Sequence, residues 1–444
     1  MIQVAQIIFI LSVLVILHEF GHYIAAKIFK VRVEKFYLFI DAGFSLIKKK
    51  IGDTEWGIGW LPIGGYVKLS GMIDESMDTE QLKQEPQPWE FRSKPGWQRL
   101  IIMLGGIFVN IVLAIFIYTI MFSTVGQKYV STEVVQKNGL AFSEVGKEVG
   151  FKNGDKIVSV DGVPVQTKFN RLIIDVLLGD KIAVDRYGKI IEVILKDEDK
   201  AKILGAEGKN FMFPRYAFVV DSISSDIARK AGLKKGDRII GVNSVKISYF
   251  DELSTLISNK ANDSVVLTLN RNNQTVEIKT KLDKDSRIGF YSKPVDLKAD
   301  YQVVNKLSFG SAIKASVKES WQLLVYNVKQ FKLILKPKTE AYKQVKSPIG
   351  IARMLPDEWD WEFIWSFTAL FSIGLAFMNL LPIPGLDGGH ALFTIAEMVT
   401  GKKLSEKNMG YVQTAGMIIL LTLMALTFGK DIYQLVIDKF FTNH

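Results

Sequence analysis

Four long runs of apolar residues divide the chain into membrane-like and polar parts. They cover residues 4–29, 100–122, 363–381 and 410–428. Each run approaches the roughly 20 residues that a helix needs to cross a hydrocarbon layer about 30 Å thick. The first run lacks the basic start and the cleavage pattern of a signal peptide, so we expect it to stay as an anchor. The pattern therefore predicts a polytopic α-helical membrane protein with four transmembrane helices in a lipid bilayer.

Between the first two runs, residues 34–71 have the pattern of short strands. Aromatic and β-branched residues are broken by Gly-Asp and Pro-x-Gly-Gly sequences, which is typical of strands joined by turns. The segment is apolar enough to enter the membrane as a re-entrant β element, provided that protein or a cavity satisfies its backbone. An ordinary cytoplasmic β-meander is the alternative.

The polar part between the second and third runs contains an internal repeat. The stretch Gly150–Gly162 recurs as Gly232–Ser244, and each copy has a Gly-Asp turn, a strand, a second turn and a helical stretch. Such self-similarity predicts two copies of one structural unit, here α+β domains over residues 126–208 and 209–294. Residues 295–360 follow as an amphipathic helical connector, suited either to a membrane surface or to ordinary core packing.

The remaining residues form two membrane domains, 1–125 and 361–444. The net charge is +10, but the basic residues are spread over linkers and small domains, so we predict no nucleic-acid partner. Basic residues follow the first run and precede the second, which predicts that their connecting segment is cytoplasmic. The chain has no cysteine, so histidine and carboxylate groups must hold any metal.

The first apolar run carries the sequence His18-Glu19-Phe20-Gly21-His22. Residues four apart lie on one helix face, about 6 Å apart at Cβ, so both imidazoles can converge on one metal ion. Glu19 lies beside them and can serve as a general base toward water. Ionisable groups are costly at membrane depth, which favours this interpretation over a buried polar cluster that joins helices.

Further polar residues interrupt the other apolar runs. Two prolines and three glycines break the chain between Asn379 and His390, and Asp387 in this break is a candidate third metal ligand. Alternatively, Asp387 is an N-cap for a helix that begins near His390, and His390 itself is more suited to a structural role. In the second run, Asn110 follows Gly106 by four residues and either bonds a neighbouring helix or faces the metal cavity and binds substrate.

Together these motifs resemble the site-2 protease family of intramembrane zinc metalloproteases, in the form that carries a tandem pair of bacterial-type PDZ domains. The resemblance covers nearly the full length of the chain. It implies a zinc cofactor held by His18, His22 and Asp387, with Glu19 as the catalytic base. It also implies a re-entrant β element that pairs with substrate, and the expected substrate-binding residues are Asn379, Asn110, Gly106, Gly65 and Tyr66.

The resemblance further implies a place and a partner. We expect a multi-pass protein of the bacterial inner membrane, with periplasmic PDZ domains and an active site that opens toward the cytoplasm. The expected partners are single-span membrane proteins, such as an anti-sigma factor or signal-peptide remnants, cut within their membrane segments. The apolar-Gly-apolar loop of a peptide-binding PDZ domain is not evident at Tyr216-Ala217-Phe218-Val219, so size screening or scaffolding is at least as well supported as peptide capture.

Two functions from other classes compete with proteolysis. A membrane scaffold that tethers partners through the paired domains would bind no zinc and would not depend on Glu19. A metal-dependent hydrolase acting on lipid would share the metal site, but the strand-rich segment 34–71 suits a peptide better than an acyl chain.

Overall fold

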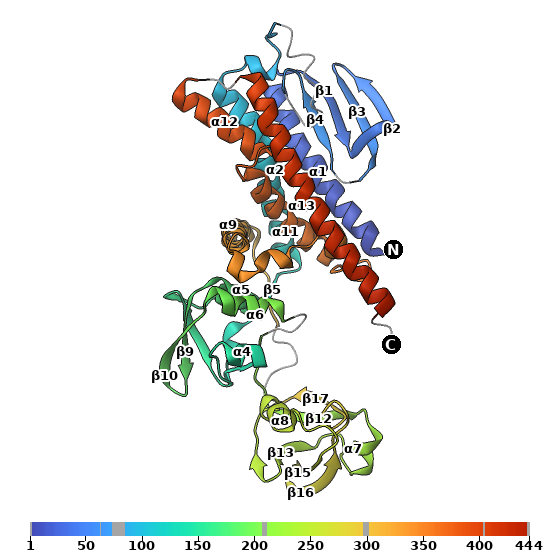
Figure 1. Cartoon of the computed structure of the whole chain (residues 1–444), viewed down its shortest axis with the longest axis vertical. Coiled ribbons are helices and arrows are strands. Elements are labelled where there is room, and N and C mark those ends of the chain that lie inside the picture. Colours follow the sequence, from blue (N-terminus) through green and yellow to red (C-terminus); the bar gives the residue numbers. More distant parts are fainter. Residues whose placement is uncertain are drawn as a thin grey trace. The chain divides into compact units, whose positions relative to one another are not determined.

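The computed structural model describes residues 2–62, 64–72, 85–206, 211–295, 302–402 and 405–441. The chain forms two compact units. The first unit holds Met1–Gly126, Lys306–Phe331 and Gln344–His444, and the second holds Gln127–Asn305 and Lys332–Lys343. Figure 1 shows the elements of both units coloured along the sequence.

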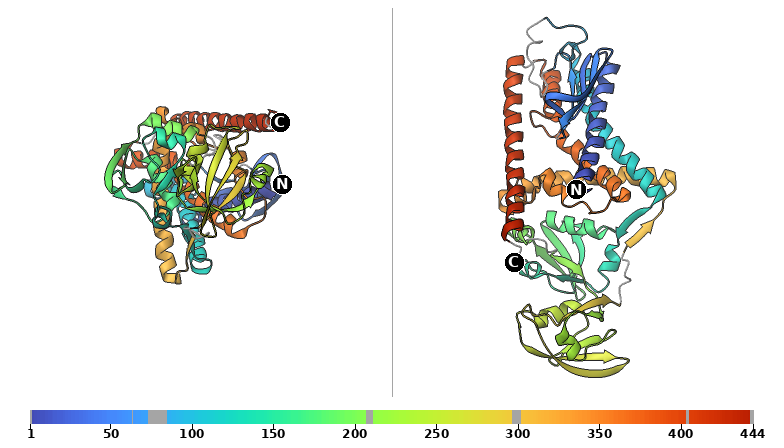
Figure 2. Two further views of the ribbon diagram at one scale, coloured as in Figure 1. Left: turned by 90° about the horizontal axis from the view of Figure 1, so that it is seen from below. Right: turned by 90° about the vertical axis from the view of Figure 1, so that its right-hand side faces the viewer.

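Four described helices of the first unit are long and apolar enough to cross a membrane. They coincide with the four apolar runs of the sequence, which confirms this part of the predicted fold class. Both Figures 1 and 2 show them running lengthwise through the unit, and α2 packs against both α1 and α11. Their bounds are α1 (Ile2–Ile28), α2 (Gly96–Thr124), α11 (Trp361–Leu380) and α13 (Glu406–Phe441).

Helices α1 and α2 touch at a pair of glycines. A Cβ atom placed on Gly105 would lie 2.6 Å from the carbonyl oxygen of Gly21. Small residues let helix backbones approach closely in lipid, where packing rather than the hydrophobic effect holds helices together. The contact brings one turn of α2 against the face of α1 that carries His18 and His22.

The strands predicted over residues 34–71 form one four-stranded sheet in the order β2-β3-β1-β4. Strand β1 pairs parallel with β3 and antiparallel with β4, so β4 is an edge strand of the described sheet. Along β2, exposed Phe44, Leu46 and Ile47 give way to three lysines toward the turn into β3. The strands are β1 (Val33–Leu38), β2 (Ile40–Ile51), β3 (Thr54–Leu61) and β4 (Tyr66–Leu69).

Shorter helices complete the connections outside the sheet and the repeats. The connector predicted over residues 295–360 contains α9, the 3-10 helices η3 and η4, and α10, and a further helix, α12, follows the break after α11. Their bounds are η2 (Phe91–Ser93), α9 (Phe309–Ile334), η3 (Pro337–Thr339), η4 (Ala341–Gln344), α10 (Pro348–Ala352) and α12 (Asp387–Thr400).

The second unit contains the two repeats, and both have the same topology. The strand order β10-β9-β7-β8 of the first repeat corresponds to β16-β15-β13-β14 of the second. The first repeat has α3 (Thr132–Val135), β6 (Leu140–Phe142), α4 (Glu144–Glu148), β7 (Lys156–Val160), β8 (Val163–Pro164), α5 (Phe169–Leu178), β9 (Lys181–Arg186), β10 (Lys189–Ile194) and α6 (Asp197–Gly205). The second has β12 (Phe218–Ile223), α7 (Asp226–Lys230), β13 (Arg238–Val242), β14 (Val245–Lys246), α8 (Phe250–Ile257), β15 (Ser264–Arg271), β16 (Gln274–Lys281) and β17 (Phe290–Pro294).

Two strand pairs adjust the expected domain boundaries. Strand β11 (Met212–Pro214) pairs with β6, so the first repeat continues to Pro214 rather than ending at residue 208. Strand β5 (Gln127–Val130) pairs with β18 (Gln302–Asn305), which closes the unit where the chain enters and leaves it. A sequence repeat marks the shared central strands, but it does not reveal which flanking strands pair with them.

A buried ion pair occurs at the same place in both repeats. The guanidinium of Arg186 donates from Nε and Nη2 to the two carboxylate oxygens of Asp155, both at 2.7 Å. Arg271 donates to Asp237 in the same way and at the same distances. Both aspartates are at most 1% exposed, and such bidentate pairing fixes geometry as well as charge. The repeat therefore extends from the Gly-Asp sequence to the arginine that neutralises it.

Candidate active site

The three predicted metal ligands lie together in the first unit. His18 and His22 are buried on α1, and Asp387 is the first residue of α12. The Nε2 atoms of both histidines lie 3.2 Å from Oδ2 of Asp387 and 3.4 Å from each other. Among the described residues, these three side chains form a group whose ligand atoms all lie within 4.8 Å of one another.

The chemistry of this group fits a cation. Nδ1 of His22 lies 2.8 Å from the carbonyl oxygen of Ile102, and because a carbonyl accepts hydrogen bonds, the ring proton must be on Nδ1. In the neutral ring, the Nε2 atom of His22 then presents a lone pair to Asp387. Oδ2 of Asp387 is itself buried without a hydrogen-bond partner in the described part of the chain. A buried anionic oxygen that faces an imidazole lone pair is costly unless a positive ion lies between them.

Helix α2 forms the wall behind the imidazoles. A Cβ atom on Gly106 would lie 2.5 Å from Nε2 of His22 and 2.6 Å from Cε1 of His18. The space that a methyl group would need is thus occupied by the two rings. Glycine at position 106 is therefore required by the packing of the imidazoles, and the expected substrate contact of this residue stays a prediction.

The two asparagines contact opposite sides of His18. The amide nitrogen of Asn110 lies 3.1 Å from Nδ1, on the side of the ring away from Asp387. The amide nitrogen of Asn379 lies 2.9 Å from Nε2, the atom that faces Asp387. Asn110 is fully buried, and its backbone carbonyl accepts a hydrogen bond from Ser372 on α11 at 2.7 Å. Asn110 thus contacts neighbouring helices, and because its amide lies beside a candidate metal ligand, a role in binding substrate stays a prediction.

The chain break before α12 positions Asp387. Helix α11 ends at Leu380, and α12 begins at Asp387 with Leu386 as its N-cap residue. Asp387 therefore does not cap a helix that begins near His390, and the N-cap alternative is wrong. A Cβ atom on Gly389 would lie 2.5 Å from the carbonyl oxygen of Ile383, so the glycines of the motif let the break fold tightly under the helix start.

His390 lies apart from the ligand group. Its ring contacts the side-chain amide of Gln413 on α13, and it does not belong to the group formed by His18, His22 and Asp387. This position agrees with the structural role expected from the sequence.

Glu19 lies between the metal ligands and the edge of the sheet. Its side chain is partly buried, and its carboxylate accepts a hydrogen bond from the backbone of Val67 on β4. A Cβ atom on Gly65 would lie 2.6 Å from Cγ1 of Val15 and 3.6 Å from Cγ of Glu19. The absence of a side chain at position 65 therefore lets the start of β4 lie directly against α1.

The side chain of Tyr66 is engaged within the sheet. Its hydroxyl donates to Asp41 at 2.9 Å, and its ring stacks on Tyr37. Any contribution of residues 65 and 66 to substrate binding would thus come from their backbone.

The second repeat contains a groove that sequence reasoning missed. A cavity of about 910 Å³ lies between α8 and β17, with apolar lining from Phe250, Leu253, Ile257, Ile288 and Phe290. Strand β17 pairs with β12 along one edge, and in the described sheet no strand pairs with its other edge. The sequence Ile288-Gly289-Phe290 at the start of β17 is an apolar-Gly-apolar loop, with Gly289 at φ +89°.

The expectation that such a loop is lacking was therefore wrong, because the loop belongs to β17 and not to the strand that begins near Tyr216–Val219. Residues Tyr216–Val219 lead into β12. The backbone of Val220 in this strand is hydrogen-bonded to Asp237 and Gly236, and β12 also pairs with β17. In this topology the strand beside α8 is the last of the repeat, not the first. The loop is visible in the sequence at Ile288-Gly289-Phe290, about 70 residues downstream of Tyr216–Val219.

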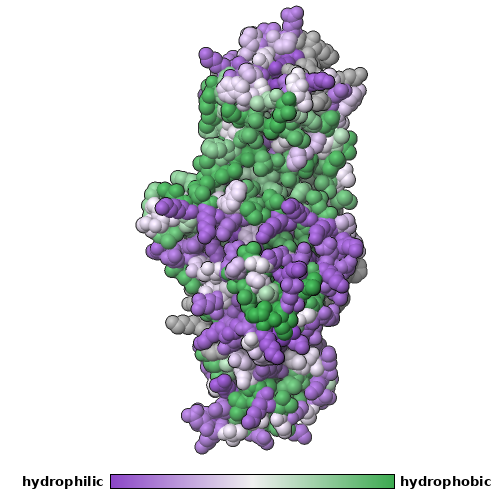
Figure 3. All heavy atoms as spheres, turned by 90° about the vertical axis from the view of Figure 1, so that its left-hand side faces the viewer, coloured by the Kyte–Doolittle hydropathy of each residue, from purple (hydrophilic) through white to green (hydrophobic). Residues whose placement is uncertain are grey.

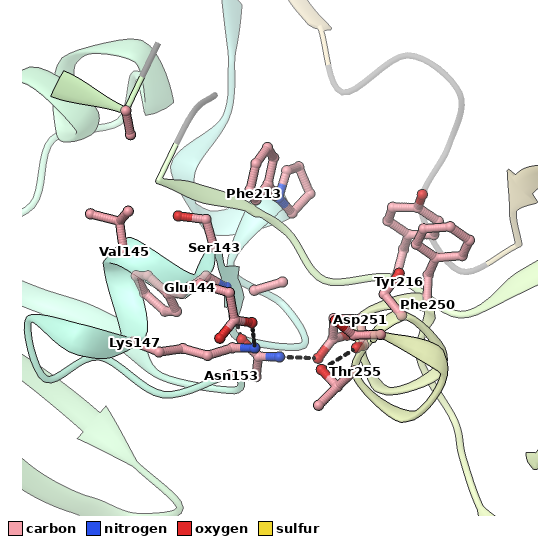
Figure 4. Close-up of a pocket in the computed structure, with 16 residues that line it drawn as sticks. Ser143, Glu144, Val145, Lys147, Asn153, Phe213, Tyr216, Phe250, Asp251 and Thr255 are labelled. Atoms are coloured by element: carbon pink, nitrogen blue, oxygen red, sulfur yellow. Dashed lines mark hydrogen bonds and ion pairs between the residues drawn. The ribbon is translucent and has the colours of Figure 1, made fainter. Parts of the chain in front are cut away.

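A second cavity of about 880 Å³ lies where the two repeats meet within the second unit. Figure 4 shows the amide of Asn153 pointing at Asp251, which it reaches at 2.8 Å. Arg215 donates to Asp251 and to Glu252, at 3.2 and 2.5 Å. The repeats are thus linked by charged hydrogen bonds beside a partly apolar hollow.

Comparison with known proteins identifies the family. Peptidase family M50 matches residues 6–423. The chain is 28% identical over 456 residues to the regulator of sigma-E protease RseP of Escherichia coli, covering 98% of this chain and 99% of the relative. It is 29% identical over 463 residues to a Neisseria meningitidis protein named "Putative zinc metalloprotease", covering 97% and 98%. The match spans the four apolar helices except the start of the first and the end of the last, together with both repeats and the three clustered side chains, and the chain belongs to peptidase family M50, the site-2 family of zinc metallopeptidases.

Proposed function

We propose that this membrane metallopeptidase hydrolyses peptide bonds within the membrane-spanning segments of single-span membrane proteins. The proposal rests on one observation: two imidazoles and a carboxylate converge on a helix that is long and apolar enough to cross a membrane. A hydrolytic site in that setting is reached most directly by substrates that are themselves in the bilayer. Membership of a peptidase family argues against both the scaffold and the lipid hydrolase.

His18, His22 and Asp387 would hold zinc through Nε2, Nε2 and Oδ2, a donor set that leaves a position open for catalysis. When bound, zinc supplies Lewis acidity, which polarises the scissile carbonyl and makes water a nucleophile at neutral pH. Ile102 would keep His22 in the tautomer that this set requires, through the hydrogen bond to Nδ1.

The remaining catalytic and positioning roles belong to side chains of the protein itself. Glu19 takes the proton from the attacking water and returns it to the leaving amine. Asn379, next to Nε2 of His18, donates its amide hydrogens to the substrate carbonyl oxygen as negative charge develops there. Asn110 holds His18 from the far side of the ring, which makes it a positioning residue rather than a substrate contact.

Strand β4 provides the substrate's docking edge. A transmembrane helix hides its carbonyls in internal hydrogen bonds, so cleavage requires local unwinding and new backbone partners. The edge of β4 lies beside Glu19 and offers such partners by strand addition. The β2–β3 hairpin has exposed apolar residues near one end and lysines near the other. This distribution supports a sheet that enters the membrane while its lysine-rich turn stays in water.

The substrate class follows from this geometry and from the relatives. An anti-sigma factor is favoured, because relatives of nearly full coverage are named as regulators of sigma-E, and signal-peptide remnants fit the same site. Basic residues between α1 and α2 favour a cytoplasmic opening of the site, with the repeats in the periplasm of a bacterial inner membrane.

The two repeats would then act as PDZ-like domains, and the second has a groove that fits an extended peptide. The open edge of β17 can add a strand, and the apolar lining suits an apolar C-terminal side chain. Lys284 and Arg287 line the same groove and would attract a free carboxylate. This arrangement suits a tail exposed by an earlier cut.

Glu19→Gln should keep zinc and lose activity. The carboxamide preserves the shape of the side chain but cannot accept the proton, so we expect turnover to fall by roughly 10²- to 10⁴-fold. Cleavage of a single-span substrate by purified protein, read by fragment mass alongside zinc content, measures both effects. His390→Ala, outside the ligand group, should change neither. Undiminished turnover of Glu19→Gln would remove this residue from the mechanism.

Gly106→Ala should lose zinc. The new methyl group would overlap both imidazole rings, so we expect the bound zinc per chain to fall several-fold in the presence of a competing chelator. Gly374→Ala is the matched control, because no atom lies within 4 Å of a Cβ atom at that position in α11. Equal zinc retention by the two variants would contradict the ligand assignment.

Gly65→Ala should weaken substrate docking without loss of zinc. The methyl group would lie 2.6 Å from Val15 and 2.7 Å from the carbonyl oxygen of Tyr37, which pushes β4 away from α1. We expect kcat/KM for a transmembrane substrate to fall by about tenfold, the equivalent of roughly 1.4 kcal/mol in transition-state binding. Gly64→Ala, with open space around its Cβ, should be neutral. A neutral Gly65→Ala would exclude β4 as the docking edge.

The groove of the second repeat should distinguish a free C-terminus from an amidated one. Loss of a charge-assisted hydrogen bond costs about 1.5–3 kcal/mol, so amidation of a peptide with an apolar last residue should weaken binding by tenfold or more. Fluorescence anisotropy with the full chain measures this affinity. Ile257→Asn should abolish the difference, whereas Ile227→Asn, an exposed isoleucine outside the groove, should preserve it. Equal affinity for both peptides would leave the groove without a role in tail capture.

A further inference from the structure

Helix α12 lies against the first turns of α2 and runs in the opposite direction (Figure 1). At the start of α12, Asp387 lies beside the imidazoles that pack on Gly106. At the other end, Met398 packs on Gly96, where a Cβ atom would lie 2.6 Å from Cγ of Met398. One end of α12 therefore contacts the candidate ligand group, and the other contacts the beginning of α2.

An ion pair joins the two helices at this second end. Nη2 of Arg99 on α2 donates to Oε1 of Glu397 on α12 at 2.6 Å. Nε of Arg99 donates to the backbone carbonyl of Lys94 at 3.1 Å. Arg99 is only 8% exposed, and a buried guanidinium is costly without its counter-charge. Arg99 therefore favours the arrangement in which Glu397 stays beside it.

The pair lies where α2 begins, at one end of the apolar helices. Exposed Trp89 and Trp97 precede Arg99 in the sequence, and tryptophans gather at the boundary between membrane and water. Figure 3 shows hydrophobic surface over the helices of the first unit and hydrophilic atoms beyond it at the top of the view. Protein surrounds the guanidinium at this level, so dissolved salt screens the pair less than it screens an exposed one.

The rest of the buried side of α12 offers little that could fix its position. Its buried residues are all small, namely Gly388, Gly389, Ala391 and Thr394. Side chains form the ridges that interlock packed helices, and small ones give shallow ridges. A shift by one residue moves a helix by about 1.5 Å, whereas metal–ligand distances tolerate only about 0.2 Å. A directional contact is therefore needed to fix how far α12 extends along α2.

We propose that Arg99 and Glu397 are positioning residues for the metal site. Their ion pair sets the place of α12 along α2, and Asp387, ten residues before Glu397 on the same helix, is thereby held close to His18 and His22. The pair acts through the helix and does not itself contact substrate. This inference rests on the proposed role of Asp387 as the third ligand.

Removal of either charge should weaken zinc binding by the full-length protein. We expect Arg99→Gln and Glu397→Gln each to lower zinc retention against a competing chelator by roughly tenfold, the lower end of the cost of losing a supporting partner. The double variant should lose no more than either single variant, because the second substitution removes a charge that the first left unpaired. Arg229→Gln is the matched control, since it removes an exposed arginine that pairs with Asp226 in the second unit, and it should retain zinc normally.

Cobalt distinguishes positioning from a general loss of stability. The visible absorption of bound Co²⁺ depends on its ligands and on their geometry. When cobalt saturates the site, a protein that is only less stable keeps the normal spectrum, whereas displacement of Asp387 changes it. We expect a changed spectrum in both neutral variants. Glu397→Asp keeps the charge but shortens the side chain, so it should change the spectrum in the same direction even if the neutral variants fold poorly.

A normal cobalt spectrum in the Arg99 and Glu397 variants would overturn the inference, even with lower zinc retention. Zinc losses that add up in the double variant would also overturn it, because they indicate two independent effects. Asp387→Asn separates these failures from failure of the proposed function, since a ligand variant should lose zinc whatever the ion pair does. Full zinc retention by Asp387→Asn would overturn the ligand assignment and the inference together.

Discussion

The contact between the backbones of α1 and α2 is the constraint on which the site depends. Gly21 and Gly105 let the helices touch, and Gly106 leaves the space into which the two imidazoles fit. With the helices this close, the carbonyl of Ile102 reaches His22 and the amide of Asn110 reaches His18. A wider separation would leave His22 without the carbonyl of Ile102 and His18 without the amide of Asn110. In lipid, where helices gain little from the hydrophobic effect, such close packing is itself the source of the helix association.

The site also requires an acidic group, which comes from a part of the chain far from the histidines in the sequence. A regular helix would carry Asp387 past the histidines, so α11 stops at Leu380 and the chain turns before α12 starts at Asp387. Irregular backbone is tolerated at membrane depth where protein surrounds it. The break also leaves Asn379 beside His18. One interruption of helical structure therefore places both the proposed third ligand and the amide of Asn379 beside His18.

Much of this organisation could be predicted from local patterns in the sequence. The four helices follow from apolar runs, and the pairing of His18 with His22 follows from helical spacing. The chain break marked Asp387 as a candidate third ligand, but only the family resemblance placed it beside the histidines, because no local pattern joins His22 to a residue 365 positions away. The groove of the second repeat was missed since the order of strands in space, not in sequence, decides that β17 borders α8. The fit between Gly106 and the imidazoles depends on side-chain geometry that spacing does not encode.

The hydrogen bond between Glu19 and the backbone of Val67 has a consequence for an idle enzyme. The amide that holds this carboxylate belongs to the strand that an incoming peptide would extend. A peptide that claims the amide sets the carboxylate free, whereas an empty edge keeps it tethered. In the proposed mechanism, occupancy of the edge and availability of Glu19 as the base are thereby linked through a single shared proton donor, and stray water meets a carboxylate that is already engaged.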